Sequence, residues 1–176
     1  MLKRPLNIGV EQTPRKLCLK SESGGGAAHA GRWQEKKMSK KADFTIIIKD
    51  NENSVQTAFD RGDYLQAFLL IHALIESLLR QFLNENDEEV KFSTLINRYE
   101  LFLKKEHYEC KTLVNELTQF NRRRNRIIHQ LWKKGYSNTN SQSKEAAEAA
   151  LTLYSLAIEF LETWDQEITK TGFEYS

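Results

Sequence analysis

The amino-acid sequence predicts an all-α fold, an antiparallel bundle of about five helices preceded by a disordered N-terminal segment. Apolar residues recur three and four positions apart through most of residues 53–172, which is the period of an amphipathic helix. Both prolines and five of the eight glycines lie before residue 40, so the rest of the chain is almost free of helix breakers. Short polar segments separate the apolar stretches, as they do between antiparallel neighbours in a bundle.

The chain divides into three parts. Residues 1–40 mix Pro, Gly, Ser and Lys without apolar periodicity, which predicts a disordered tail or upstream sequence read in frame before a start at Met38. Residues 41–52 hold the β-branched run Phe44 to Ile48 and then a turn-forming cluster. This pattern predicts an extended lead-in, either a single edge strand or an extended arm. The helical bundle is expected to fill residues 53–172.

The first two expected helices form a pair. Ser54 to Arg61 is a short helix with Asn53 or Ser54 as N-cap, and Gly62 stands where a C′ glycine belongs. Asp63 is expected to cap a second helix that reaches Leu83. Apolar residues cover most of the circumference of this second helix. A helix this apolar is normally covered on two sides, here by its own bundle and by a second subunit.

The remaining helices follow at shorter intervals. Ser93 to about Leu103 predicts a third helix, and about Glu109 to Trp132 a fourth. Residues 135–143 are rich in Gly, Ser, Asn and Thr and predict a mobile loop. Ser143 then caps a last helix, whose apolar seam runs from Ala147 to Ile168.

Composition and charge exclude several classes of protein. The net charge is +2, but residues 41–176 carry 17 basic and 21 acidic side chains, so any attraction for RNA must be local. Cys18 and Cys110 indicate no disulfide framework, and the four histidines lack zinc-ligand spacing, so neither a metal nor another cofactor is expected. No apolar run is long enough to span a bilayer. We therefore expect a cytoplasmic protein without a membrane partner.

Residues 120–130 are the most unusual stretch, with the sequence Phe-Asn-Arg-Arg-Arg-Asn-Arg-Ile-Ile-His-Gln. Four arginines within five residues repel one another on a helix, and an acidic side chain or a phosphate nearby would offset that repulsion. A helix turns about 100° per residue. Arg124 is therefore about 140° from His129 around the helix, whereas three residues lie on the face of His129: Arg122, Asn125 and Arg126.

The segment Arg124-Asn125-Arg126-Ile127-Ile128-His129 resembles the Arg-x(4–6)-His motif of the HEPN superfamily, in which a polar residue often follows the arginine. The helix order is similar over roughly residues 53–170: an apolar second helix, the motif on the penultimate long helix and a final amphipathic helix. The resemblance implies a homodimer whose motif helices face each other across one cleft and cut RNA without a metal. It also implies a toxin–antitoxin, anti-phage or stress setting, with an antitoxin as a possible protein partner.

The resemblance assigns roles to the motif residues. His129 would be the general base or general acid, Arg124 would bind the scissile phosphate, and Asn125 would orient the phosphate or the imidazole. Arg122 is a close alternative to Arg124, because six residues separate it from His129. With Arg123 and Arg126 it completes the expected phosphate-binding set.

One position departs from a branch of the superfamily. In toxins paired with a nucleotidyltransferase antitoxin, a tyrosine commonly stands two residues after the motif histidine. Leu131 stands there in this chain, which weakens assignment to that branch and regulation by nucleotide transfer to this site.

Other residues have two interpretations. His72, Glu76 and Arg80 are spaced by four on the second helix, so Glu76 and His72 either support a catalytic group or belong to an ion-pair ladder facing solvent. Trp132 and Tyr136 are interpreted as packing residues rather than as base-stacking platforms.

Two further function classes compete with the ribonuclease. One is a non-catalytic HEPN-like module whose arginines hold RNA or an acidic protein. The other is a purely structural bundle that dimerises with a partner protein, which predicts that the arginines pair with carboxylates of the same chain: Glu76, Glu109 or Glu116.

Overall fold

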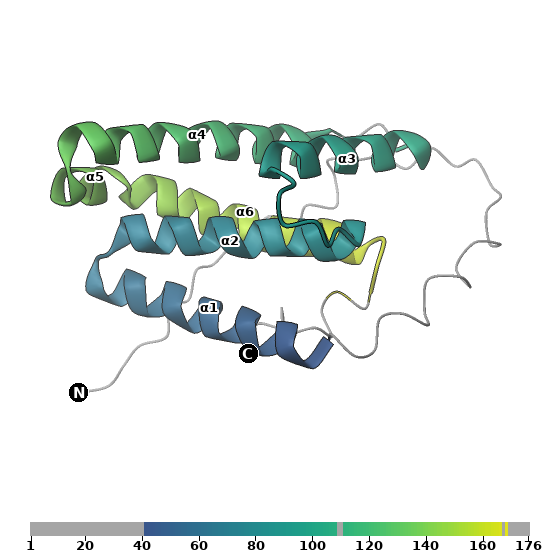
Figure 1. Ribbon diagram of the computed structural model, residues 1–176, viewed down its shortest axis with the longest axis horizontal. Coiled ribbons are helices and arrows are strands. Elements are labelled where there is room, and N and C mark those ends of the chain that lie inside the picture. Colours follow the sequence, from purple (N-terminus) through teal and green to yellow (C-terminus); the bar gives the residue numbers. More distant parts are fainter. Residues whose placement is uncertain (1–40, 109–110, 167, 169–176) are drawn as a thin grey trace, which may run out of the picture.

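The computed structural model describes residues 41–108, 111–166 and 168, with side chains from residue 47 onward, and these residues form helices and no strand (Figure 1). The helices are α1 (Lys41–Arg61), α2 (Tyr64–Leu83), α3 (Phe92–Lys105), α4 (Thr112–Lys134), α5 (Tyr136–Gln142) and α6 (Lys144–Glu162). The predicted all-α bundle is confirmed. The interpretation of residues 1–40 lies outside the described part of the chain.

Helix α2 is the centre of the bundle. It contacts α1, α3, α5 and α6, and the aromatic ring of its Phe68 packs on Phe120 of α4 at 5.1 Å between centroids. Nine of its residues are buried, and each large apolar side chain removed from water contributes about 1.5–3 kcal/mol. By length and composition α2 could also span a membrane, a test that core helices of soluble proteins pass as well. The helices that contact α2 bury 44% of that apolar stretch.

The turn between α1 and α2 depends on Gly62. Its φ of 74° lies in the left-handed region, where a residue without Cβ is favoured, as expected for a C′ glycine. The Gly62 N–H donates to the Phe59 carbonyl at 3.0 Å, and the Asp63 N–H donates to the Ala58 carbonyl at 2.8 Å. Asp63 stands at the N-cap of α2, but its side chain makes no capping hydrogen bond. The chain therefore reverses sharply and lays α1 against α2.

The extended lead-in expected for residues 41–52 is wrong, because α1 is helical from Lys41 onward. The β-branched run has a low helix propensity, but packing outweighs it. Ile48 is fully buried, and Val55 and Ala58 are buried one turn apart further along the helix. Glu52 accepts a hydrogen bond from the Tyr154 hydroxyl of α6 at 2.7 Å. These contacts come from other helices, so the local sequence did not reveal them.

The loop expected for residues 135–143 is also wrong, because Tyr136–Gln142 forms the short helix α5. The side chain of Asn140 fixes α5 in place through two partners that lie 75 and 78 residues earlier in the chain. Its Oδ1 accepts from the Leu65 N–H at 2.8 Å, and its Nδ2 donates to the Gly62 carbonyl at 2.9 Å. Asn140 thereby supplies the cap that Asp63 was expected to give to α2. Ser143 stands at the N-cap of α6, but its hydroxyl donates backward, to the Thr139 carbonyl at 2.7 Å.

Replacement of Asn140 by alanine is expected to lower the free energy of unfolding by about 1–3 kcal/mol, because the Leu65 amide and the Gly62 carbonyl both lose their partner. Urea denaturation followed by circular dichroism measures the loss. Asn138→Ala is the matched control on the same helix, since Asn138 is exposed, and its effect is expected to stay within about 0.5 kcal/mol. Equal stability of the two variants would contradict the role of Asn140.

Candidate functional site

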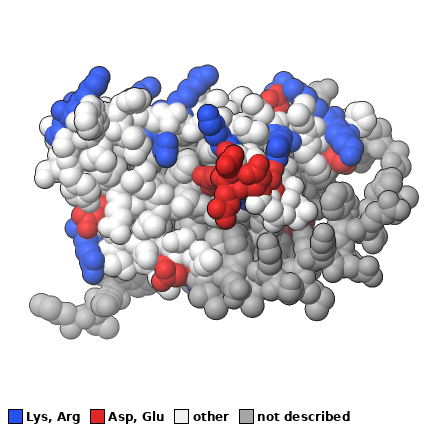
Figure 2. Space-filling model, in the orientation of Figure 1, with Lys and Arg blue, Asp and Glu red and all other residues white. Residues whose placement is uncertain are grey.

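The outer side of α4 carries a row of basic side chains at spacings of four, three and four residues, which places them on one face of the helix. Phe120 and Ile127 are buried on the opposite side, so packing against the bundle fixes the direction of this face. Blue side chains follow the edge of the molecule that α4 forms in Figure 2. We call this set the cationic row, and all its members are exposed: Arg122, Arg126, His129 and Lys133.

The charge of the cationic row is not neutralised within the described part of the chain. No ion pair there joins Arg122, Arg123 or Arg126 to a carboxylate. The Glu76 carboxylate is already engaged by Arg80 at 2.8 Å. The pairings expected for a purely structural bundle are therefore absent for Glu76 and Glu116, while Glu109 lies outside the described residues. Among the described residues, these exposed arginines therefore have no carboxylate partner.

Arg124 has a different environment from the other arginines. It is half-buried, and its Nε is enclosed without a hydrogen-bond partner among the described residues. Its Nη1 donates to the Oδ1 of Asn125 at 3.2 Å. The angle of about 140° that separates Arg124 from His129 thus turns the arginine toward the bundle. Its hydrogen bond to Asn125 connects Arg124 to the outer face, because Asn125 lies four residues before His129.

His72 is the buried neighbour of Arg124. Only 8% of His72 is exposed, and its ring lies 4.6 Å from Phe92 and 5.5 Å from Phe120 between centroids. Burial lowers the pKa of His72 from 6.5 to about 4, the charge of Arg124 lowers it as well, and the Glu76 carboxylate acts in the opposite direction. Near neutral pH this imidazole is uncharged. The solvent-facing ladder is therefore wrong for His72.

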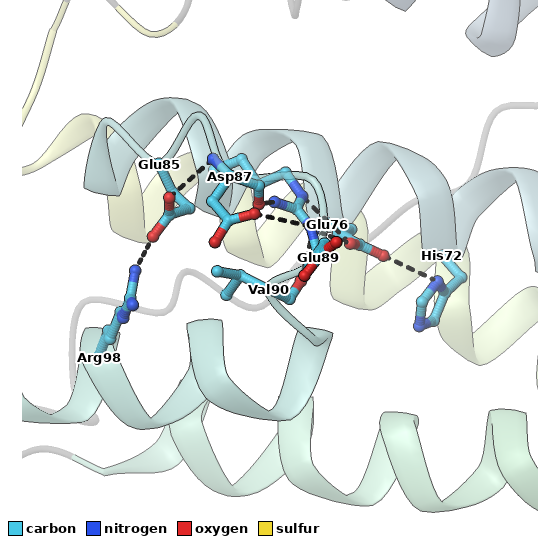
Figure 3. A network of polar contacts seen from close by, with 8 residues as sticks. His72, Glu76, Glu85, Asp87, Glu89, Val90 and Arg98 are labelled. Atoms are coloured by element: carbon cyan, nitrogen blue, oxygen red, sulfur yellow. Dashed lines mark hydrogen bonds and ion pairs between the residues drawn. The ribbon is translucent and has the colours of Figure 1, made fainter.

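Glu76 and Arg80 form the polar part of that stripe. The Glu76 carboxylate accepts from Arg80 Nη2 at 2.8 Å and from Nε at 3.1 Å (Figure 3). Arg80 also donates to the carbonyls of Asp87 at 2.7 Å and Val90 at 2.5 Å. These bonds hold the connection between α2 and α3, so Phe92 begins α3 directly over His72. Glu76 therefore pairs with Arg80, and its second carboxylate oxygen lies 3.9 Å from the Nδ1 of His72.

The structure thus divides the predicted site residues between two sides of α4. Arg122, Asn125, Arg126 and His129 share the exposed outer side, with Arg123 also exposed, whereas Arg124 lies on the inner side with His72 and Glu76. Sequence reasoning missed Lys133, although its position four residues after His129 indicated the same face.

The C-terminal part of α4 also borders an apolar groove, on the side of the helix away from His129. An open groove of about 400 Å³ lies between α2, α4 and α5. The side chains that line it are mostly apolar: Leu65, Gln66, Leu69, Leu70, Leu131 and Tyr136. Trp132 is 88% exposed and Tyr136 is 49% exposed. The interpretation as a packing residue is therefore wrong for Trp132 within the single chain, whereas the Tyr136 hydroxyl donates to Asp63 Oδ1 at 3.4 Å. No periodicity argument could reveal the groove, since it depends on how three helices meet.

No known protein family, no curated protein and no solved structure matches this chain. Among the described residues, no group of three or more His, Cys, Asp or Glu side chains is arranged to hold a metal ion.

The buried His72 predicts a pH-dependent stability. Its pKa of about 4 in the folded protein lies below 6.5, so between these pH values the unfolded chain binds a proton that the folded chain does not. Stability is then lost as the pH falls from about 6.5 toward 4. The contribution of His72 amounts to about 2 kcal/mol between pH 7 and pH 5.

Replacement of His72 by leucine, which has a similar size and does not titrate, is expected to remove that part of the slope. Urea denaturation at pH 7 and pH 5 measures it, as the difference between wild type and variant. His107→Gln replaces an exposed histidine and is expected to keep the wild-type slope. Parallel pH profiles of wild type and His72→Leu would refute the assignment.

Proposed function

We propose that the protein is a metal-independent endoribonuclease of HEPN type that acts as a homodimer. The observation that carries the proposal is the position of His129, exposed between Arg126 and Lys133 on a face whose arginines have no carboxylate partner in the described chain. A proton-transfer group in line with unpaired cations is what cleavage of a phosphodiester by the RNA's own 2′-hydroxyl requires.

The reaction assigned to this face moves one proton at each end of the phosphate. The 2′-oxygen loses its proton to a base and forms a bond to phosphorus, while the bond to the 5′-oxygen breaks and that oxygen gains a proton. The products are a 2′,3′-cyclic phosphate and a 5′-hydroxyl. Histidine can accept the proton of the 2′-hydroxyl or donate a proton to the 5′-oxygen. His129 takes one of these steps, and a second copy of the protein supplies the other.

Stabilisation of the phosphorane falls to Arg122 and Arg126 in this proposal. Both stay charged, offer forked donors to phosphate oxygens and share the face of His129. The half-buried position of Arg124 favours a positioning role, in which its Nη1 holds the Asn125 carbonyl oxygen and leaves the Asn125 amide N–H groups for the phosphate or the imidazole. The motif alone gives Arg124 as the first candidate for binding the scissile phosphate and Arg122 as the second. In this proposal Arg122 binds the phosphate and Arg124 has the positioning role.

The biological setting rests on the resemblance. A toxin–antitoxin or defence role in the cytoplasm, with an antitoxin that covers the motif, follows from the kind of protein in which this motif occurs. The cationic row of α4 is the surface that such an inhibitor would have to block.

A second candidate function is a non-catalytic HEPN-like module that binds RNA or an acidic protein. The same exposure of Arg122, Arg123 and Arg126 favours it, because phosphate binding needs the cations and not the histidine. The two functions differ in the consequence of removing His129 alone.

The first test is cleavage of a mixed RNA substrate in EDTA. His129→Ala is expected to lower kcat/KM by at least about 100-fold, which is the scale of general acid–base catalysis, while RNA binding changes little. Arg122→Ala and Arg126→Ala are expected to weaken both. Arg61→Ala is the matched control, because Arg61 is an exposed arginine at the end of α1, outside α4.

Wild-type cutting that leaves 2′,3′-cyclic ends and is lost with His129→Ala supports the ribonuclease. His107→Gln, which alters an exposed histidine outside α4, should cut like the wild type. Undiminished cutting by His129→Ala would remove His129 from the mechanism. RNA binding without cutting by any of these proteins would favour the binding module.

A further inference from the structure

Trp132 is a protruding apolar side chain beside an apolar depression. It is the most exposed large hydrophobic residue of the described chain, at 88%, and it stands one helical turn after His129. Leu131, the preceding residue, lines the groove between α2, α4 and α5. Trp132 is not part of the lining, and its indole projects about 100° further round α4 than Leu131. Ile128, one turn before Trp132, is also exposed and extends the apolar surface along α4.

The groove has the size and chemistry to take an aromatic ring. Its volume of about 400 Å³ is open on one side, and it is lined by leucines of α2 and α4 with Tyr136 at one end. Gln66 is the polar residue of the lining, and it is uncharged. Figure 2 shows a broad area without charged side chains over the N-terminal half of α2 and the adjoining side of α4. The charged side chains lie around this area.

A knob and a hole on one surface make that surface complementary to itself. A two-fold dimer requires this property, because the same patch contacts its own copy and every contact occurs twice. A large aromatic anchor in an apolar pocket is also the usual centre of an interface. The absence of charge in the patch avoids the repulsion that two cationic rows of α4 would cause if they met directly.

We propose that a second copy of this chain covers the patch, and that Trp132 of each copy fills the groove of the other. Each indole then contacts the partner's Leu131 and Tyr136, so the ends of the two α4 helices meet. Because Trp132 is one turn from His129, the same interface brings the two His129 side chains to the borders of one surface. The interface stands on the apolar patch alone, whereas its meaning for catalysis rests on the proposed function.

Sedimentation equilibrium of the full chain tests the proposal with two variants that alter exposed residues. Trp132→Ala removes the knob, and Gln66→Arg places a charge in the groove without touching the core. A central aromatic anchor is worth at least about 30-fold in the dissociation constant of a contact. Since each contact occurs twice, both variants are expected to be monomers at concentrations where the wild type is a dimer. Leu101→Ala, which alters a residue of α3 that is 63% exposed, should remain a dimer.

A mixture of the two variants separates this interface from any other effect. The Gln66→Arg chain retains its indole and the Trp132→Ala chain retains an intact groove, so one of the two contacts is restored. The mixture is expected to form a heterodimer that is weaker than the wild-type dimer. A monomeric wild type, a dimeric Trp132→Ala variant or a mixture that stays monomeric would each overturn the interface.

These experiments distinguish failure of the proposed interface from failure of the proposed ribonuclease activity. If the dimer behaves as expected and no protein cuts RNA, the interface stands and the nuclease proposal fails. If Trp132→Ala sediments like the wild type and loses affinity only for single-stranded RNA, Trp132 is a stacking platform for an unpaired base and the interface is refuted.

Discussion

The burial of α2 is the constraint on which the rest of the structure depends. A helix with apolar residues on most of its circumference must be covered on most of its circumference, and α1, α3, α5 and α6 arrange themselves to do so. Phe68 and Phe120 then fix the position of α4 against it. The part of α2 that these helices leave open becomes the floor of the groove. The packing of the other helices around α2 therefore determines both the orientation of α4 and the position of the apolar groove.

The inner side of α4 carries an unusual cost. The Nε of Arg124 and the Nε2 of His72 are both buried without a hydrogen-bond partner in the described chain, and each such group costs about 1–3 kcal/mol. The aromatic packing of His72 on Phe92 and Phe120 offsets part of that cost. A charged guanidinium beside a neutral imidazole is a poor choice for stability alone. Its contact with Asn125 connects this buried pair to the exposed side of α4, which is where a functional reason for the cost would lie.

Much of the fold could be predicted from the sequence, because helical periodicity reports which side of a helix faces the core. The same periodicity predicts that Arg122, Asn125 and Arg126 lie on the face of His129, and the structure has all four exposed. It could not locate the start of α1 or the existence of α5, since Ile48 and Asn140 are held by partners far away in the chain. Nor could it distinguish a residue that packs within its own chain from one that faces outward. That distinction decides the roles of Trp132 and Arg124.

The proposed cleavage reaction and the proposed dimer are linked by the number of histidines that each chain exposes on α4. Cleavage through a 2′-hydroxyl needs one group that accepts a proton and one that donates it. Among the described histidines, His72 is buried and neutral and His107 lies in the connection between α3 and α4, so α4 exposes a single candidate per chain. A second copy of the chain would add a second exposed histidine. An interface centred one turn from His129 would supply the second from the partner, so the anchor that joins the copies would also complete the site.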